Sequence, residues 1–284
     1  MSLIGGVVKS VTQRSGSRKP PGGVVAAGFV LLALAVLALW PSLVASYSPL
    51  ETDASSTLQP PSAEHVFGTD QSGRDVFSRV VHGAQYSLAI GLGATGVALG
   101  LGLLLGVFAA LGSRLVDGIL SRVIDVLMAF PEFLLALVVI AVMGPGESSI
   151  PLAVALAATP AYARVARAET LVVAQAGYVR ASASLGVSRT RIILFHIIPN
   201  ISGPLLVMAT IGVGTAIVTA AGLSFLGLGA QPPTPEWGII LSEGRNFLAT
   251  AWWIAVFPGL AITTSVVSIS VVGRYFGTRR EVVL

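Results

Sequence analysis

Residues 80–113 read VVHGAQYSLAIGLGATGVALGLGLLLGVFAALGS, and apart from His82 these 34 residues contain no ionisable side chain. A helix that crosses a bilayer needs ~20 predominantly apolar residues, so this run is long enough to span one. Two further runs have the same character: residues 192–235 contain only His196 as an ionisable group, and residues 246–273 contain none. This pattern predicts an all-α membrane protein.

The composition agrees with this interpretation. Hydrophobic residues make up 54% of the 284 residues and charged residues only 11%, against ~25% charged in a typical soluble domain. Cysteine is absent, which excludes disulfides, thiolate metal sites and a cysteine nucleophile. The net charge of +4 is spread over many short loops, so it indicates membrane topology rather than nucleic-acid binding.

Six membrane spans are predicted, and each is bounded by charged or turn-forming residues. They cover residues 22–45, 86–112, 122–143, 148–163, 201–225 and 251–272. The first could instead be a signal peptide, but about two dozen apolar residues exceed the 7–15 of a signal core and favour a retained span. The fourth is the weakest prediction because it is short and contains Pro151 and Pro160.

The distribution of Lys and Arg predicts the orientation. With the amino terminus inside, 14 of the 17 basic residues fall in cytoplasmic segments, so both termini are expected in the cytoplasm. The expected organisation is a tail (1–21), a transmembrane permease domain (22–272) and a second tail (273–284). Within the domain we expect outer segments at 46–85 and 226–250 and a cytoplasmic loop at 164–199.

The chain offers little for catalysis or cofactor binding. The stretches between spans are shorter than the ~50 residues that a soluble catalytic domain usually needs. The three histidines lie 17 and 114 residues apart, which does not fit a helical metal-binding pair. The G-x-G-x-x-G sequence at 91–96 lies inside a span, where Gly96-x-x-x-Gly100 and Gly102-x-x-x-Gly106 favour helix packing. No Gly-Lys dipeptide, and hence no phosphate-binding loop, occurs. We therefore expect no catalytic residue, no metal ligand and no cofactor on this chain.

The loop sequence YVRASASLGVSRTRIILFHIIPN at 178–200 predicts two short helices joined at Gly186, because glycine tolerates the left-handed geometry of a helix end. This loop resembles the one that permease subunits of ABC importers insert into their ATPase, with the pattern E-A-A, three residues, G, nine residues, I-x-L-P. Here Arg180 replaces the acid, Ser182 an alanine and His196 the first apolar residue of the ending. The coupling residues implied by the resemblance are Arg180, Ala181, Ser182, Leu185, Gly186, Val187, Arg189, His196 and Pro199.

Two more stretches strengthen the resemblance. FGTDQSGRDVFSR at 67–79 is similar to a segment of peptide and nickel ABC permeases, and LSFLGLGAQPPTPEWG at 223–238 resembles the signature of the C-type subunit of dipeptide and oligopeptide importers.

The resemblance implies a type I importer permease with six spans in a bacterial inner membrane. It also implies a second permease, two cytoplasmic ATPases that bind ATP and Mg²⁺, an external solute-binding protein and surrounding lipid, with no nucleic acid. The implied activity is ATP-driven uptake of di- or oligopeptides by alternating access. The alternatives are a permease for nickel or another small solute, an ion-coupled secondary transporter and a membrane scaffold that transports nothing.

Individual residues leave alternatives open. Asp70, Arg74 and Asp75 either fix the shape of the outer segment, which such turn-rich sequences favour, or contact the binding protein. Glu132 lies near the middle of the third span, where an ionisable group suggests function, and Asp125 lies two helical turns earlier; both could line the translocation path.

Alternatively, Pro131 breaks this span and Glu132 starts a new helix. Trp237, Trp252 and Trp253 are expected to anchor the outer membrane interface.

Overall fold

The computed structural model describes residues 21–281, and within this range the chain is helical with no β-strand. Five helical segments are long and apolar enough to cross a membrane. They are α1 (Gly22–Leu39), α2 (Val76–Leu111), α5 (Ser149–Ala174), the continuous segment Arg189–Phe225, and α10 (Trp253–Glu281). The predicted all-α membrane fold is confirmed.

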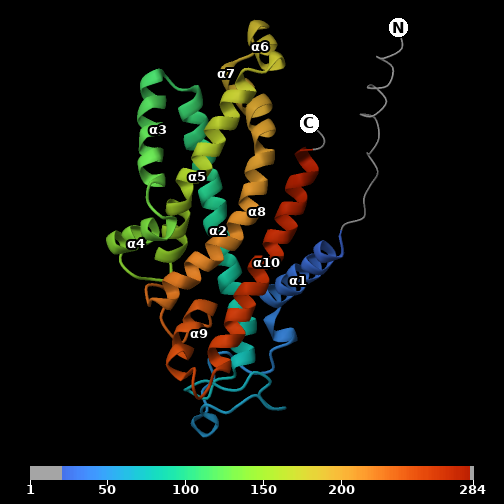
Figure 1. Cartoon of the computed structure of the whole chain (residues 1–284), viewed down its shortest axis with the longest axis vertical. Helices are drawn as coiled ribbons and strands as arrows, with labels where there is room; N and C mark the ends of the chain where they lie inside the picture. The colour runs from blue at the N-terminus through green and yellow to red at the C-terminus, as the bar shows by residue number, and fades with distance from the viewer. Residues whose placement is uncertain (1–20, 282–284) are drawn as a thin grey trace, which may run out of the picture.

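The third predicted span, residues 122–143, is not one continuous helix but belongs to a pair of helices. α3 (Arg114–Met128) and α4 (Glu132–Met143) meet at a bend of 100°, so that α4 lies across the lower end of the upright α3 in Figure 1. Pro131 has no backbone N–H and a fixed φ, so it ends one helix and begins the next. Glu132 then occupies the first turn of α4, where the helix dipole favours a carboxylate. The alternative that Pro131 breaks the span is confirmed.

α5 continues well beyond the predicted end of the fourth span at residue 163. It passes through Pro160 without ending and runs to Ala174. Gly102 and Gly106 of α2 permit close packing against it, because an added Cβ would lie 2.3 Å from Tyr162 Cβ and 2.5 Å from the Ala163 carbonyl oxygen, respectively. By contrast, a Cβ added at Gly96 or Gly100 would have no described neighbour outside its own helix within 4 Å. The packing role predicted for the glycines is therefore confirmed for only one of the two pairs.

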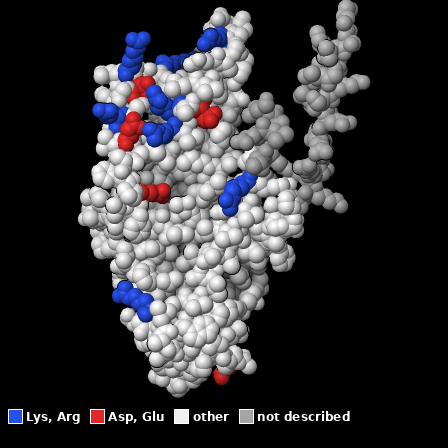
Figure 2. Space-filling model, viewed as in Figure 1, with Lys and Arg blue, Asp and Glu red and all other residues white. Residues whose placement is uncertain are grey.

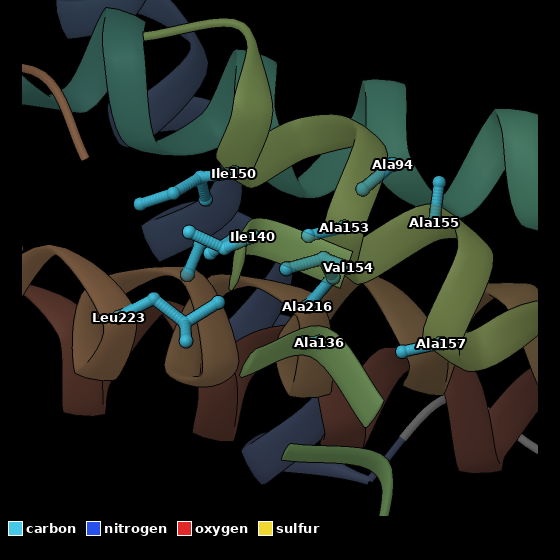
Figure 3. Close-up of a cluster of buried hydrophobic side chains, with 11 residues drawn as sticks. Ala94, Ala136, Ile140, Ile150, Ala153, Val154, Ala155, Ala157, Ala216 and Leu223 are labelled. Carbon is cyan, nitrogen blue, oxygen red and sulfur yellow. The ribbon is translucent and has the colours of Figure 1, made fainter. Parts of the chain in front are cut away.

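The central core joins α2, α4, α5 and α8 (Ile198–Phe225). Figure 3 shows its side chains converging from these helices, with small alanines beside Ile140, Ile150 and Leu223. Alanine at the helix contacts allows the backbones to approach closely, as is typical of membrane helix packing.

The outer segment and the short α9 (Trp237–Gly244) form the opposite end of the molecule from α3 and α6 (Figure 1). Trp237 and Trp253 are buried here, with indole N–H groups that donate to the carbonyl oxygens of Val80 (2.8 Å) and Thr69 (3.0 Å). The prediction that these two tryptophans anchor the membrane interface is wrong, because their hydrogen bonds join segments of the protein. Of the three tryptophans in that prediction, only Trp252 is exposed.

Candidate functional site

The cytoplasmic loop predicted from the sequence forms a projection at one end of the molecule. α6 (Gly177–Ser184) ends at Leu185, and α7 (Arg189–Ile192) begins the long helical segment that contains α8. In Figure 1, α6 and α7 lie beyond the end of α5, apart from the main body of helices. The surface in Figure 2 shows arginine side chains at this same end, with acidic side chains among them.

The turn of the projection depends on Gly186. Its φ is +80°, a left-handed conformation that glycine adopts without steric penalty. The Gly186 N–H donates to the Ala183 carbonyl (3.0 Å) and the Val187 N–H to the Ser182 carbonyl (3.1 Å). This is the hydrogen-bond pattern of a Schellman helix end, so the helix–glycine–helix shape predicted for this loop is confirmed.

The tip of the projection is apolar. Leu185 is 84% exposed, and the positions beside it in the sequence carry small or polar side chains. Arg180, Ala181 and Arg189 are also exposed. A single exposed leucine is common on protein surfaces, so it is the place of Leu185 at the tip of a projection, and not its exposure alone, that makes it a candidate contact.

His196 connects the two arms of the projection. Its Nε2 lies 3.5 Å from Ser182 Oγ, and its ring stacks against Tyr178 at 6.4 Å between centroids. Two of the three departures from the family pattern, Ser182 and His196, thus face each other across the turn. The spacing of the motif alone gave no indication of this pairing.

The second arm of the projection continues as one helical segment from Arg189 to Phe225. The π-helical turn η4 (Ile193–Ile197) precedes Pro199, and the Asn200 side chain donates to the His196 carbonyl at 2.6 Å. A π-helical turn absorbs the local mismatch caused by a proline that cannot donate a backbone hydrogen bond. Arg189 also donates to the Leu111 carbonyl at the end of α2. Movement of the projection would therefore be transmitted to α2 and α8.

Asp125 and Glu132 are separated by the bend between α3 and α4, so they do not share a helix face. Asp125 pairs with Arg164 of α5 (2.8 Å), and both side chains are more than half exposed. Sequence reasoning missed the stronger neighbouring pair, in which Arg167 donates from Nε and Nη2 to the two oxygens of Asp117 (2.6 and 2.8 Å). The three-residue spacing of Arg164 and Arg167 places both on one face of α5, but it does not identify their partners in α3.

Glu132 lines a cavity of about 200 Å³ between α2, α4, α5 and α8. Tyr162 lies in the same wall, and Thr95 and Thr215 also line the cavity. It is the candidate part of the translocation path that this chain provides.

Asp70 and Arg74 belong to a buried charge cluster in the outer segment. Asp70 Oδ2 accepts from Arg74 Nε (2.6 Å) and Arg79 Nη1 (2.7 Å), and Glu243 of α9 accepts from both arginines (2.8 and 2.6 Å). The flanking charges and hydrogen bonds raise the pKa of Arg74 despite its burial. Arg79 and Glu243 were not identified from the sequence, because 164 positions separate them.

Asp75 caps α2 by accepting from the Ser78 N–H (2.7 Å) and contacts His65 Nδ1 (3.0 Å). Asp70, Arg74 and Asp75 are each at most 4% exposed. The geometry thus favours the structural alternative for these three residues.

Comparison with known proteins agrees with the fold. Residues 102–282 match the family model described as "Binding-protein-dependent transport system inner membrane component". The chain is 41% identical over 244 residues to the dipeptide transport system permease protein DppC of Alkalihalophilus pseudofirmus, covering 86% of this chain and 80% of the relative. It is 39% identical to the di/tripeptide permease DppC of Pseudomonas aeruginosa, covering 86% and 82% of the two chains. It is 43% identical to the glutathione permease GsiD of Escherichia coli, covering 90% and 84%.

Solved structures resemble this fold. The MetNI methionine ABC transporter matches with a TM-score of 0.57 at 18% identity, covering 71% of this chain and 95% of that one. The crystal structure of an amino acid ABC transporter with histidines matches with a TM-score of 0.55 at 15% identity. That match covers 71% of this chain and 94% of the other. The chain belongs to the family of binding-protein-dependent transport system inner-membrane components, the permease subunits of ABC importers.

Proposed function

We propose that this protein is the permease subunit of an ATP-driven importer that carries di- and oligopeptides across the bacterial inner membrane. The relatives named above as dipeptide, di/tripeptide and glutathione permeases support this substrate class. The observation that carries the coupling role is the exposed Leu185 at the tip of a projection that continues as one helical segment from Arg189 to Phe225.

The proposed assembly contains a second permease, two ATPases and an external binding protein. ATP and Mg²⁺ are bound by the ATPases, and this chain contributes neither a catalytic residue nor a metal ligand. The projection docks on an ATPase with both termini on the same, cytoplasmic side. The end that carries the outer segment and α9 then faces the binding protein.

In the proposed mechanism, closure of the ATPases displaces the projection. Because η4 and α8 continue from it without a break, the displacement passes to the helices that line the cavity. Contacts of Arg189 with α2 and of α3 with α5 make these helices move together. Alternating access follows when the cavity opens first toward the binding protein and then toward the cytoplasm.

Two alternatives predict different results. A nickel or other small-solute importer would retain the same assembly but respond to a different solute. An ion-coupled secondary transporter would need ionisable groups along its path, but Asp125 is paired with Arg164 on an exposed surface, which leaves Glu132 as the remaining candidate.

The test is purification of the tagged chain in mild detergent with mass spectrometry of co-eluting proteins, followed by an ATPase assay with binding protein and dialanine. We expect a second permease and ATPases, and hydrolysis that peptide stimulates. A chain that elutes alone and transports without ATP would contradict the proposal, whereas stimulation by nickel and not by peptide would support the first alternative.

A further inference from the structure

The cavity between α2, α4, α5 and α8 contains one acidic group in otherwise mostly apolar surroundings. Among the side chains that the structure describes, those of residues 21–277, Glu132 has no ion-pair partner. A carboxylate within a membrane protein is costly unless a positive charge compensates it. The local structure keeps Glu132 there nonetheless, in the first turn of α4 directly after Pro131.

The Tyr162 side chain provides a second, independent observation. It is 97% buried (3% exposed), its hydroxyl has no hydrogen-bond partner, and the side chain lines the same cavity as Glu132. A buried hydroxyl without a partner costs about 1–3 kcal/mol, so such groups are usually satisfied by a water or a ligand.

The position of this hydroxyl is determined by two glycines. A Cβ at Gly212 of α8 would lie 2.1 Å from Tyr162 Oη, and a Cβ at Gly102 of α2 would lie 2.3 Å from Tyr162 Cβ. Only glycine leaves room for the ring at both places. The tyrosine is thereby held between α2 and α8, with its hydroxyl buried beside Gly212 and its side chain in the wall of the cavity.

We propose that this cavity binds the terminal ammonium group of the transported peptide, with Glu132 as its counter-charge and the Tyr162 hydroxyl as a neutral acceptor. The ligand class follows from the chemistry: an ammonium group has three N–H donors and a positive charge, and the cavity offers a carboxylate and an unused oxygen. The inference rests on the proposed peptide import for the identity of that ligand.

The size of the cavity agrees with an end group rather than a whole peptide. Its volume of about 200 Å³ far exceeds the space for one water but lies below the ~300–1,000 Å³ of pockets that enclose drug-sized ligands. Because every unblocked peptide has the same terminal ammonium, recognition of this group would not depend on peptide sequence.

The absence of cysteine from the chain permits a direct test of the charge preference. Thr215→Cys places one thiol in the cavity wall, within the complete complex. Its reaction rates with cationic 2-aminoethyl methanethiosulfonate and anionic 2-sulfonatoethyl methanethiosulfonate are compared with and without Glu132→Gln. Any effect of Glu132 on thiol ionisation cancels in the ratio of the two rates.

We expect Glu132→Gln to lower the cation-to-anion rate ratio about tenfold, the factor for ~1.4 kcal/mol of lost Coulomb attraction. Glu147→Gln, an exposed carboxylate away from this cavity, should leave the ratio unchanged. Dialanine should slow modification, and N-acetyl-dialanine should not. A ratio that stays within twofold, a thiol that neither reagent reaches, or equal protection by both peptides would overturn the inference.

Uptake measurements distinguish this inference from the proposed function. With the complete importer in liposomes, Glu132→Gln should lower dialanine uptake about tenfold and Tyr162→Phe by less, while Glu132→Asp retains part of the activity. Each variant must co-purify with its partners as the unaltered chain does. An unaltered importer that carries no peptide refutes the proposed function, whereas normal uptake by a folded Glu132→Gln variant refutes the ammonium site alone.

Discussion

Arg79 in α2 donates from Nη2 to Oε2 of Glu243 in α9 across 2.6 Å, and neither side chain is more than 11% exposed. The same guanidinium reaches Asp70, so the outer segment, α2 and α9 share one buried charge cluster. This cluster joins the segment before α2, α2 itself and α9 through buried ion pairs.

Removing one member of this cluster should destabilise the protein strongly. Glu243→Gln leaves Arg74 and Arg79 with one carboxylate between them in a buried site, and breaking a buried pair costs about 3–5 kcal/mol. Asp125→Asn breaks the exposed pair with Arg164, for which about 0–1 kcal/mol is expected. Thermal denaturation of the detergent-solubilised complex measures the stability of both variants. Equal losses of stability would show that the cluster does not stabilise the fold.

Glycine should be required in α2 only where α5 approaches. Gly106→Ala places a Cβ 2.5 Å from the Ala163 carbonyl oxygen, and overpacking of this kind costs about 1–3 kcal/mol. Gly100→Ala is the matched control, since nothing in the chain lies within 4 Å of its Cβ. Yield and thermal stability of the purified chain report the difference. Similar losses in both variants would argue against the α2–α5 contact as the cause.

Gly186→Pro should uncouple ATP hydrolysis from peptide uptake. Proline fixes φ near −65°, which is incompatible with the +80° of Gly186, so the turn between α6 and α7 cannot form. Gly177→Pro is the control, because it lies at the first position of α6, where proline is tolerated, and Ala176 has the extended conformation (ψ 144°) that precedes proline well. Uptake per ATP hydrolysed is the measurement, and normal uptake by Gly186→Pro would exclude the projection as the coupling element.

Leu185→Asp should weaken the attachment of the ATPase without disturbing the fold. Leu185 is 84% exposed, so its replacement changes no internal packing but places a charge at the tip of the projection. Gln175→Asp introduces the same charge at the exposed end of α5 and should retain the ATPase. The measurement is the amount of ATPase that co-purifies with each variant. If Leu185→Asp retains as much ATPase as the unaltered chain, the contact lies elsewhere.

The buried carboxyl of Glu236 should make stability fall with rising pH. Burial raises the pKa of Glu236, although hydrogen bonds from the Gly238 and Ile239 N–H groups oppose the shift. A raised pKa in the folded state gives stability that is complete below the unfolded pKa of 4.5 and is lost as the pH rises through the folded value. Glu236→Gln keeps an acceptor for α9 and should remove this slope.

Thermal unfolding between pH 4.5 and 7.5 tests this expectation. Glu64→Gln changes an exposed carboxyl and serves as the control. An unchanged slope in Glu236→Gln would assign the pH dependence to other groups.

The sequence alone predicted the helical membrane fold, because uncharged runs of this length have no soluble alternative. It also predicted the helix–glycine–helix shape of the loop around Gly186, since the requirement for a left-handed residue there is local and glycine satisfies it. The break at Pro131 was one of two alternatives, because a proline in a span can kink a helix or end it. The 100° bend between α3 and α4 decides between them.

What only the tertiary structure decided is which distant side chains meet. The Arg79–Glu243 pair, the face of Tyr162 toward the Glu132 cavity and the burial of Trp237 depend on how helices pack, and nothing in the order of residues reveals those contacts. Apolar periodicity carries little information in a membrane, where lipid-facing and buried positions are both hydrophobic. Local conformation in this protein was therefore readable from the sequence, whereas its charge clusters and cavity required the packed helices.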